Sequence, residues 1–141
     1  MKYLLDTCVL SELVKPAPEP AVLQWMGVRQ EQALFLSAMT LAELHRGVAK
    51  LPGSRRRTEL TSWLEKLEGS FEERVLQFSQ ATAKQWATMC ARAEAAGFPL
   101  AAFDSIIAAT AVEHGLTVVT RNVGDFAQTL VPVVNPWSVA S

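Results

Sequence analysis

The sequence of 141 residues lacks the features of several protein classes. It has no excess of basic residues, because 13 Lys and Arg are opposed by 14 Asp and Glu, so no general positive field attracts nucleic acid. The two cysteines, Cys8 and Cys90, do not have the spacing of a disulfide framework. No apolar run reaches the roughly 18 residues of a transmembrane helix, and no basic segment before a long apolar stretch marks a signal peptide. We therefore expect a cytoplasmic protein that makes no membrane contact and binds nucleic acid, if at all, through local patches.

The residues that are present fit one compact domain. Half of them are hydrophobic and 19% are charged, which is typical of globular rather than disordered chains. The length suits a single domain with one substantial core. Because no internal repeat, low-complexity stretch or linker interrupts the chain, we predict one domain over residues 1–141.

Strand-like and helix-like segments alternate along the chain. Short apolar runs predict strands at residues 2–5, 33–38, 75–78, 117–120 and 132–134. Helices are predicted at residues 7–14, 21–28, 40–51, 55–67, 79–96 and 104–114. This alternation implies right-handed βαβ units, and the unbroken apolar strands suit a sheet that is covered on both faces. We predict a three-layer α/β/α domain with a mainly parallel sheet of about five strands.

Four carboxylates stand where a predicted strand gives way to a helix or turn. Asp6 ends the run YLLD, and Asp125 lies five residues beyond the run TVVT. Glu43 lies a few residues past FLSA, and Asp104 opens the most apolar of the predicted helices. Because ligands bind at the carboxyl ends of the strands in an open parallel sheet, we expect the four side chains to converge at one edge.

Such a convergence predicts a site for a hard metal ion. Carboxylates held close together repel one another, and each raises the pKa of its neighbours unless a cation neutralises them. Oxygen ligands without a paired Cys or His set favour Mg²⁺ or Mn²⁺. The pattern therefore indicates metal-assisted chemistry on phosphate.

Each acidic residue also has a purely structural interpretation. The spacing of Thr40 and Glu43 matches a capping box, in which Glu43 reaches back to the backbone amide of Thr40. Asp6 and Asp104 suit helix N-caps, and Asp125 suits a turn. For any one of them the structural role is the more common one. Caps on unrelated helices have no reason to converge, so the four together favour a functional site.

Four segments resemble the successive motifs of PIN-domain ribonucleases. They are MKYLLDTCVLSEL around Asp6, TLAELHRG around Glu43, FDSIIAATA around Asp104 and TRNVGDF around Asp125. Their order and spacing cover essentially the whole chain, so the resemblance is more specific than any single motif. Within that superfamily, the length and the ending VNPW are similar to the VapC toxins of bacterial type II toxin–antitoxin pairs, in the FitB-like branch.

The resemblance implies an activity and a set of partners. Family members have an α/β/α fold, bind Mg²⁺ or Mn²⁺ through such acidic residues and cleave RNA. They form dimers, and a cognate VapB-type antitoxin blocks their active site and provides their only link to operator DNA. One difference from many relatives is Cys8, because they carry Asn after Asp-Thr and a thiol hydrogen-bonds carboxylates poorly.

The expected function is that of a metal-dependent endoribonuclease toxin. Asp6 and Asp104 are the best candidates for direct metal ligands. Glu43 and Asp125 would complete the shell, bind a second ion or orient the water that attacks the scissile phosphodiester.

Polar and basic residues beside the carboxylates are candidates for supporting roles. Thr120 and Asn122 would hydrogen-bond the carboxylates or a phosphate, although bonding at a strand end or turn is an equally common role for them. Arg46 and Arg121 flank the carboxylate edge and are candidates for phosphate contact.

Two protein contact surfaces are predicted. An apolar stripe on the helix at 55–67 marks a homodimer contact, and its members are Leu60, Trp63, Leu64 and Leu67. An amphipathic antitoxin helix would lie in an apolar groove near the N-terminal helices, between the Pro-rich segment 15–20 and the helix at 55–67. An antitoxin arginine would neutralise the carboxylates.

Two other function classes remain open. An acyl-phosphate phosphotransferase would use Asp6 as its nucleophile, but such enzymes commonly carry a second acid two residues on, where this chain has Cys8. A catalytically weak PIN-like binding module would have no need to retain all four acids. His45 and His114 have no adjacent Ser or Cys to activate, so we expect both at the surface.

Overall fold

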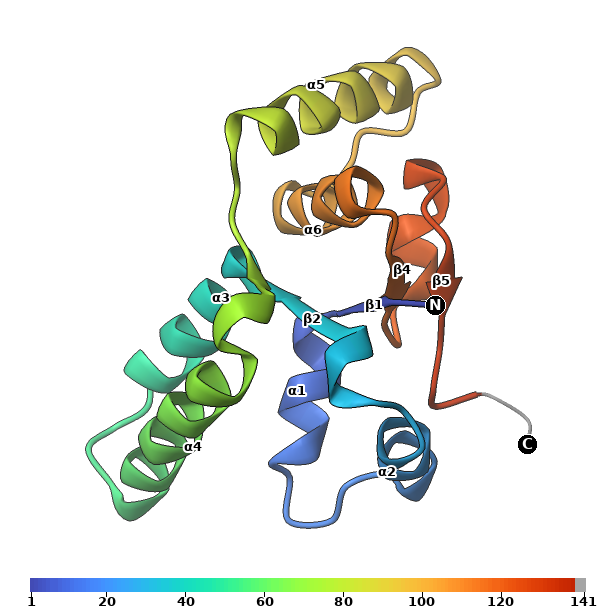
Figure 1. Cartoon of the computed structure of the whole chain (residues 1–141). Helices are drawn as coiled ribbons and strands as arrows, with labels where there is room; N and C mark the ends of the chain where they lie inside the picture. Colours follow the sequence, from blue (N-terminus) through green and yellow to red (C-terminus); the bar gives the residue numbers. More distant parts are fainter. Residues whose placement is uncertain (139–141) are drawn as a thin grey trace.

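The computed structural model describes residues 1–138, and in them strands and helices alternate as predicted (Figure 1). The strands are β1 (Tyr3–Leu5), β2 (Leu34–Ser37), β3 (Val75–Leu76), β4 (Thr117–Val119) and β5 (Val133–Val134). The helices are α1 (Thr7–Leu13), α2 (Pro20–Gly27), α3 (Ala38–Ala49), α4 (Arg55–Phe71), α5 (Gln80–Ala95) and α6 (Ala102–His114). Short 3₁₀ segments are η1 (Glu31–Ala33), η2 (Glu72–Arg74) and η3 (Val123–Thr129).

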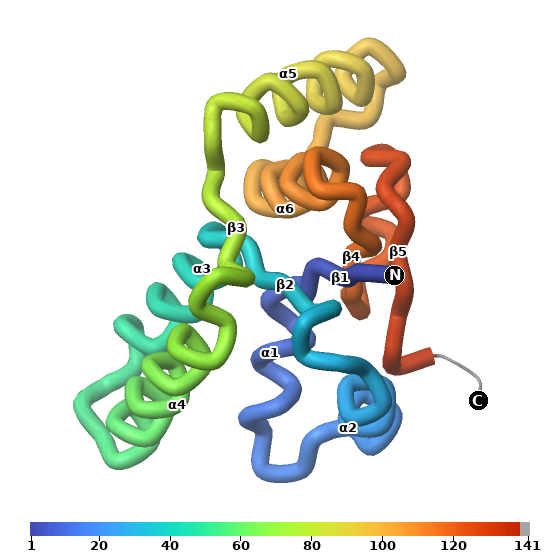
Figure 2. Tube along the Cα trace, viewed as in Figure 1, coloured from blue at the N-terminus to red at the C-terminus, as the bar shows by residue number. Residues whose placement is uncertain are grey.

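The strands form one parallel sheet in the order β3-β2-β1-β4-β5. In the centre, Tyr3 of β1 is paired with Leu34 of β2 on one side and with Thr117 of β4 on the other. The chain therefore builds the sheet outward from β1 in one direction and later returns to the other side of β1, as the trace in Figure 2 shows. The carboxyl ends of β1 and β4 meet at this reversal, which is where open α/β sheets bind ligands.

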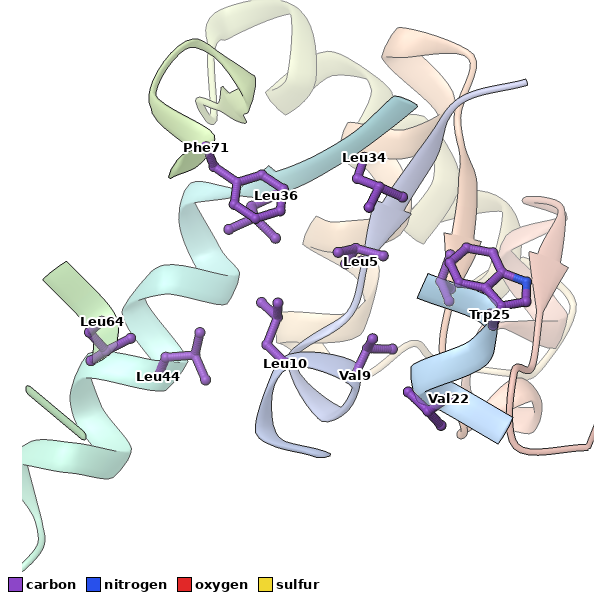
Figure 3. Close-up of a cluster of buried hydrophobic side chains, with 11 residues drawn as sticks. Leu5, Val9, Leu10, Val22, Trp25, Leu34, Leu36, Leu44, Leu64 and Phe71 are labelled. Atoms are coloured by element: carbon purple, nitrogen blue, oxygen red, sulfur yellow. The ribbon is translucent and has the colours of Figure 1, made fainter. Parts of the chain in front are cut away.

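The sheet is buried on both faces, because neighbouring residues of each central strand point to opposite sides. Leu4 and Val118 contribute to a core beneath α5 and α6, whereas Leu5 and Val119 contribute to a core beneath α1 to α4, and all four are fully buried. Figure 3 shows the second core, in which Leu5 lies among side chains from α1, α2, α3 and α4. The predicted three-layer α/β/α domain with a parallel sheet of five strands is confirmed.

Helix α6 is apolar on nearly every side and lies between the sheet and α5 (Figure 1). Its residues Ile107, Ala108 and Ala111 are fully buried, as predicted from the sequence. Gly115 ends the helix with a φ of 66°, a left-handed conformation that glycine adopts without strain. Even so, none of the helices in residues 1–138 is both long and apolar enough to span a bilayer.

Helix α3 begins earlier than the sequence predicted, which changes the interpretation of Glu43. The predicted capping box placed Thr40 at the helix start. The helix instead begins at Ala38, and the side chain of Ser37 accepts a hydrogen bond from the Thr40 N–H at 3.0 Å. The predicted cap was wrong because Ser37, at the end of β2, already satisfies that amide. Glu43 is thus left without a capping role.

The apolar stripe of α4 is used largely within the molecule. Leu64 is 1% exposed, and Trp63 and Leu67 pack against the core beneath α1 to α4. Helix α4 is therefore held mainly by contacts with α3, and the homodimer stays a prediction.

Candidate functional site

Asp6 lies at the carboxyl end of β1, in the centre of the sheet, and is 5% exposed. Its Oδ1 accepts a hydrogen bond from the Thr7 N–H at 2.8 Å, so it caps α1 as the structural interpretation expected. Its Oδ2 accepts a second bond from the hydroxyl of Thr120 at 2.8 Å. Thr120 follows β4, so this bond joins the carboxyl ends of the two central strands. Helix capping does not require it, and it fixes the direction of the carboxylate.

Glu43 approaches Asp6 through Thr7. The Thr7 hydroxyl donates to Glu43 Oε1 at 2.7 Å, a bond between residues 36 positions apart in the chain. Thr7 therefore bonds both acids, through its amide to Asp6 and through its hydroxyl to Glu43. Asp6 and Glu43 are thus brought to the same edge of the sheet by their bonds to one residue.

Cys8 lies beside Asp6 and Thr120, at distances longer than those of strong hydrogen bonds. Its Sγ lies 3.7 Å from Asp6 Oδ2 and 3.5 Å from the Thr120 hydroxyl, and it accepts a bond from the Arg121 N–H at 3.4 Å. Burial raises the pKa of the Cys8 thiol, so the group stays a neutral S–H at physiological pH. A neutral thiol donates only weakly to the carboxylate beside it.

Asp104 lies in the first turn of α6, two residues after the helix begins at Ala102. It was expected to open or cap this helix, and that was wrong, because Ala101 occupies the cap position. The pKa of Asp104 rises from 3.8 to about 6, first through burial and then through the negative charges of Asp6, Asp125 and Glu43. Asp104 therefore lies within the electrostatic reach of three acids from separate parts of the chain.

Asp125 is the exposed member of the group and belongs to η3. Its N–H donates to the Asn122 carbonyl at 3.0 Å, which closes the turn predicted for it. Its side chain lines the same hollow as Asp104. The turn is therefore compatible with a role in the site.

The chemistry of these residues suits a hard divalent cation. Within residues 1–138, no three Asp, Glu, His or Cys side chains already stand close enough together to hold a metal ion. A cation held by three or more of them would therefore require their side chains to move closer together. The donor set is oxygen-only, and the raised pKa of Asp104 marks an unfavourable concentration of negative charge that a cation would relieve.

The structure places the two predicted basic residues differently relative to the carboxylates. Arg46 is exposed on α3 and lines a small hollow together with Glu43. Arg121 is exposed next to Thr120, and its guanidinium lies 5.5 Å from the centre of the Trp137 ring. Asn122 contributes through its backbone N–H, which donates to the Thr120 hydroxyl at 3.0 Å.

Two larger hollows each include two residues of the site in their lining. The first, which we call the apolar groove, has a volume of about 280 Å³ and runs from Thr7 and Glu43 between α1, α3 and α4. Its other walls are Leu44, Val48, Leu51, Leu60 and Trp63. The second, which we call the loop hollow, has a volume of about 380 Å³ and lies between residues 97–101 and η3. Asp104 and Asp125 form part of its lining.

Both histidines lie at the surface, as predicted. His45 pairs with Glu68 across α3 and α4, and His114 lies 3.5 Å from the Glu113 carboxylate. Neither lines the apolar groove or the loop hollow.

The sequence interpretation missed two residues near the site. Thr7 is the link between Asp6 and Glu43. Its signal was a hydroxyl placed directly after a candidate ligand. Glu12 is 5% exposed and accepts bonds from Lys15 Nζ at 2.8 Å and from the Glu19 N–H at 2.9 Å. The sequence signal for Glu12 was a lone acid on a short apolar helix. Its bond to the Glu19 N–H holds the Pro-rich segment against α1.

Known proteins match the chain along almost its full length. The PIN domain family matches residues 3–129. The chain is 39% identical to the VapC ribonuclease Y4jK of Sinorhizobium fredii, over 97% of this chain and 99% of that protein. It is 40% identical to the toxin FitB of Neisseria gonorrhoeae, over 95% of this chain and 97% of that protein.

A solved structure matches the fold just as closely. The chain superimposes on a structure of FitAB bound to an IR36 DNA fragment with a TM-score of 0.93 and 36% sequence identity. The match covers 99% of this chain and 98% of that one.

Proposed function

The chain belongs to the PIN-domain family, and from this premise we propose that it is a metal-dependent endoribonuclease acting as the toxin of a type II toxin–antitoxin pair. Relatives that match nearly the whole chain are a VapC ribonuclease and the toxin FitB. A fold alone does not define a function, so the proposal depends on the site.

The observation that carries the proposal is the electrostatic coupling of the four acids. The charges of Asp6, Asp125 and Glu43 act together with burial to raise the pKa of Asp104 to about 6. Placing Asp104 among three other carboxylates has no structural benefit for the free protein, because their charges disfavour its ionised form. A site that binds a divalent cation and a phosphodiester has a reason to keep this arrangement.

We assign Asp6, Asp104, Glu43 and Asp125 as the residues that would hold Mg²⁺ or Mn²⁺. When bound, the ion would neutralise the phosphodiester and activate water for its hydrolysis. Asp6 already points in one direction, because Thr7 and Thr120 each occupy one of its oxygens. Such supporting bonds keep a metal ligand oriented before the ion arrives.

Other side chains would position the RNA. Arg46, one helical turn after Glu43, and Arg121, beside Thr120, are exposed cations at the acidic edge. A guanidinium binds two phosphate oxygens at once, so these two residues would hold the phosphates on either side of the scissile bond.

Cys8 disfavours the acyl-phosphate alternative. Enzymes that phosphorylate an aspartate commonly carry a second acid two residues on, and in this chain that position holds Cys8, a neutral thiol. The weak binding module remains the competing candidate, and measured cleavage separates it from the ribonuclease.

We further propose a VapB-type antitoxin as the partner and a homodimer as the assembly. The apolar groove ends at Glu43, so an amphipathic helix seated in it would bring a following arginine to the carboxylates. Operator DNA would be reached only through the antitoxin. Light scattering at micromolar concentration tests the assembly, and a monomer would refute the dimer.

The test of the function is RNA cleavage by the purified chain with and without divalent metal. We expect cleavage of single-stranded or looped RNA with Mg²⁺ or Mn²⁺, none in EDTA, and recovery when excess Mn²⁺ is restored. The Asp6→Asn variant serves as the control for a contaminating nuclease. Equal cleavage by this variant, or cleavage in EDTA, would refute the proposal.

A further inference from the structure

The loop hollow adjoins the carboxylates and has the size of a small-ligand pocket. Its volume of about 380 Å³ falls within the range of roughly 300–1,000 Å³ that such pockets occupy. Asp104 and Asp125 line it on the side of the proposed metal site. Gly97, Phe98 and Gln128 line it elsewhere, and none of these three has a role in the proposed hydrolysis.

The backbone of the wall that carries Phe98 is held by hydrogen bonds, although the side chain is exposed. Helix α5 ends in a Schellman motif, in which the Phe98 N–H donates to the Ala93 carbonyl at 2.9 Å and the Gly97 N–H donates to the Glu94 carbonyl at 3.0 Å. Gly97 has a φ of 85°, which the motif requires. The residue after that glycine usually packs back onto its helix. Phe98 is instead 54% exposed, so a fixed backbone presents a free aromatic face.

The other wall is formed by η3, which is held in place by a buried side chain and a hydrogen bond. Phe126 of η3 is fully buried, and its carbonyl accepts a bond from the Thr129 hydroxyl at 2.6 Å. Gln128, between them, is exposed and lines the hollow. In Figure 1 the gold loop after α5 and the orange-red segment before β5 lie on the same side of the molecule. Local hydrogen bonds thus hold the backbone of both walls.

The lining of the hollow beyond the metal site offers no partner for a phosphate. Asp104 and Asp125 are assigned to the metal, and no Lys or Arg of residues 1–138 lines the hollow. A phosphate would find no cationic side chain there, whereas a flat, neutral group would find the aromatic ring of Phe98 and the polar side chain of Gln128. Unpaired nucleobases have this chemistry, and proteins bind them by stacking on aromatic side chains and by hydrogen bonds to their edges.

We propose that the loop hollow is a subsite for one unpaired RNA nucleobase next to the scissile phosphate, which rests on the proposed ribonuclease function. Phe98 stacks on the base, and Gln128 hydrogen-bonds its edge. Because a Gln amide can pair with both the N6 amino group and N7 of adenine, adenine is preferred there over uracil. The loop hollow thereby contributes to the choice of cleavage sequence.

The test uses the full chain and a set of short RNA oligonucleotides that differ in the bases flanking the cut. Stacking on an aromatic side chain strengthens binding by roughly 5- to 150-fold per base. Phe98→Ala should therefore raise KM by at least about fivefold with little change in kcat, and should flatten the preference over uracil. Phe98→Tyr retains the ring and should restore both. Gln128→Ala should flatten the preference with a smaller rise in KM.

A matched control comes from the other end of α5. Phe78 is 46% exposed just before that helix, and a helix of this length separates the two phenylalanines by about 24 Å. Phe78→Ala should leave KM and base preference unchanged. Phe98 is more than half exposed, so its variants should fold, and circular dichroism checks this.

The outcomes separate this inference from the proposed function. If the wild-type chain cleaves RNA but Phe98→Ala keeps its KM and base preference, the subsite is wrong and the ribonuclease survives. If the wild-type chain does not cleave, the ribonuclease fails, and fluorescence anisotropy of RNA binding in EDTA decides the subsite by the same comparison of variants. If Phe98→Ala alters antitoxin affinity or oligomeric state while RNA binding is unchanged, the hollow is a protein contact and the subsite is refuted.

Discussion

The two larger hollows beside the carboxylates differ more in chemistry than in size. The apolar groove, of about 280 Å³, is walled largely by apolar side chains such as Leu44, Leu60 and Trp63. The loop hollow, of about 380 Å³, is lined by the loop at 97–101, the first turn of α6 and η3, and it mixes apolar residues with Asp104, Asp125 and Gln128. An apolar wall suits a polypeptide helix, and a polar wall with one aromatic face suits a base. We infer that one side of the acidic edge serves the partner and the other serves the substrate.

The largest effect is expected from the carboxylates themselves, because the proposed binding of both the antitoxin and the RNA depends on them. Asp104→Asn should reduce RNA cleavage by on the order of 100-fold or more, because it removes a charge from the proposed metal site. Glu94→Gln, an exposed acid on α5, is the matched control and should keep full activity. Initial cleavage rates at saturating Mn²⁺ measure the effect. Full activity of Asp104→Asn would remove that residue from the site.

A charge in the apolar groove should separate the partner from the substrate. Leu60→Asp places a carboxylate where an apolar helix would dock, so the Kd for the antitoxin should rise by about 100-fold. Cleavage by the free protein should stay within about twofold of the wild type. Leu130→Asp, at a residue that is 72% exposed after η3, should leave the antitoxin Kd unchanged. Titration calorimetry decides this, and equal weakening by both variants would contradict the division between the two sides.

Replacing the antitoxin arginine is a second test of the difference between the two hollows. Replacing it with Ala should restore nuclease activity more than it weakens the complex, because the apolar groove supplies most of the binding and the arginine supplies the inhibition. Cleavage assays with the purified complex test this. A mutant antitoxin that still inhibits fully would exclude an arginine at the carboxylates.

A smaller effect is expected at Thr7, where the apolar groove meets the acids. Thr7→Val keeps the shape of the side chain but removes the 2.7 Å hydrogen bond to Glu43. Losing a bond to a charged acceptor should lower kcat by about tenfold with KM little changed. Thr7→Ser keeps the hydroxyl and should retain most of the activity. If Thr7→Val changes KM alone, Thr7 serves binding rather than the orientation of Glu43.

The smallest effect concerns stability without metal. The pKa of Asp104 is about 6 in the folded protein and 3.8 without the fold, so the folded state binds this proton more tightly. Its contribution to the free energy of unfolding therefore falls as pH rises from about 4 to 6 and stays low above 6. In EDTA, Asp104→Asn should raise Tm by roughly 1–3 °C at pH 7.5, since solvent screens this half-buried group, and should give no gain near pH 4. Calorimetric scans at both pH values test the sign, and a lower Tm at pH 7.5 would contradict it.

Asp6 is not expected to behave in the same way. Its carboxylate accepts bonds from Thr7 and Thr120, so an amide in its place disturbs bonds that hold α1 to the sheet. In Asp6→Asn, relief of charge repulsion would raise the free energy of unfolding, and loss of these bonds would lower it. Asp104 is therefore the cleaner site for the stability measurement.

The sequence predicted what depends on local pattern. Apolar runs located the strands, and their alternation with helices implied the parallel order that brings Asp6 and Thr120 together. The prediction of the start of α3 was wrong because two nearby residues both suit the N-cap position. Ser37 and Thr40 both suit the cap of α3, and only the position of β2 decides between them. The loop hollow was not predicted, because it depends on how the end of α5 packs against η3.

Binding of Mn²⁺ to the apo protein, measured by titration calorimetry, tests the central claim most directly because it needs no RNA substrate. The wild-type chain and Glu94→Gln should each show saturable binding with the same affinity. Asp104→Asn should lose it, and Asp125→Asn should weaken it. If Mn²⁺ binds Asp104→Asn as tightly as the wild type, or binds none of these proteins, the four carboxylates do not form one metal site.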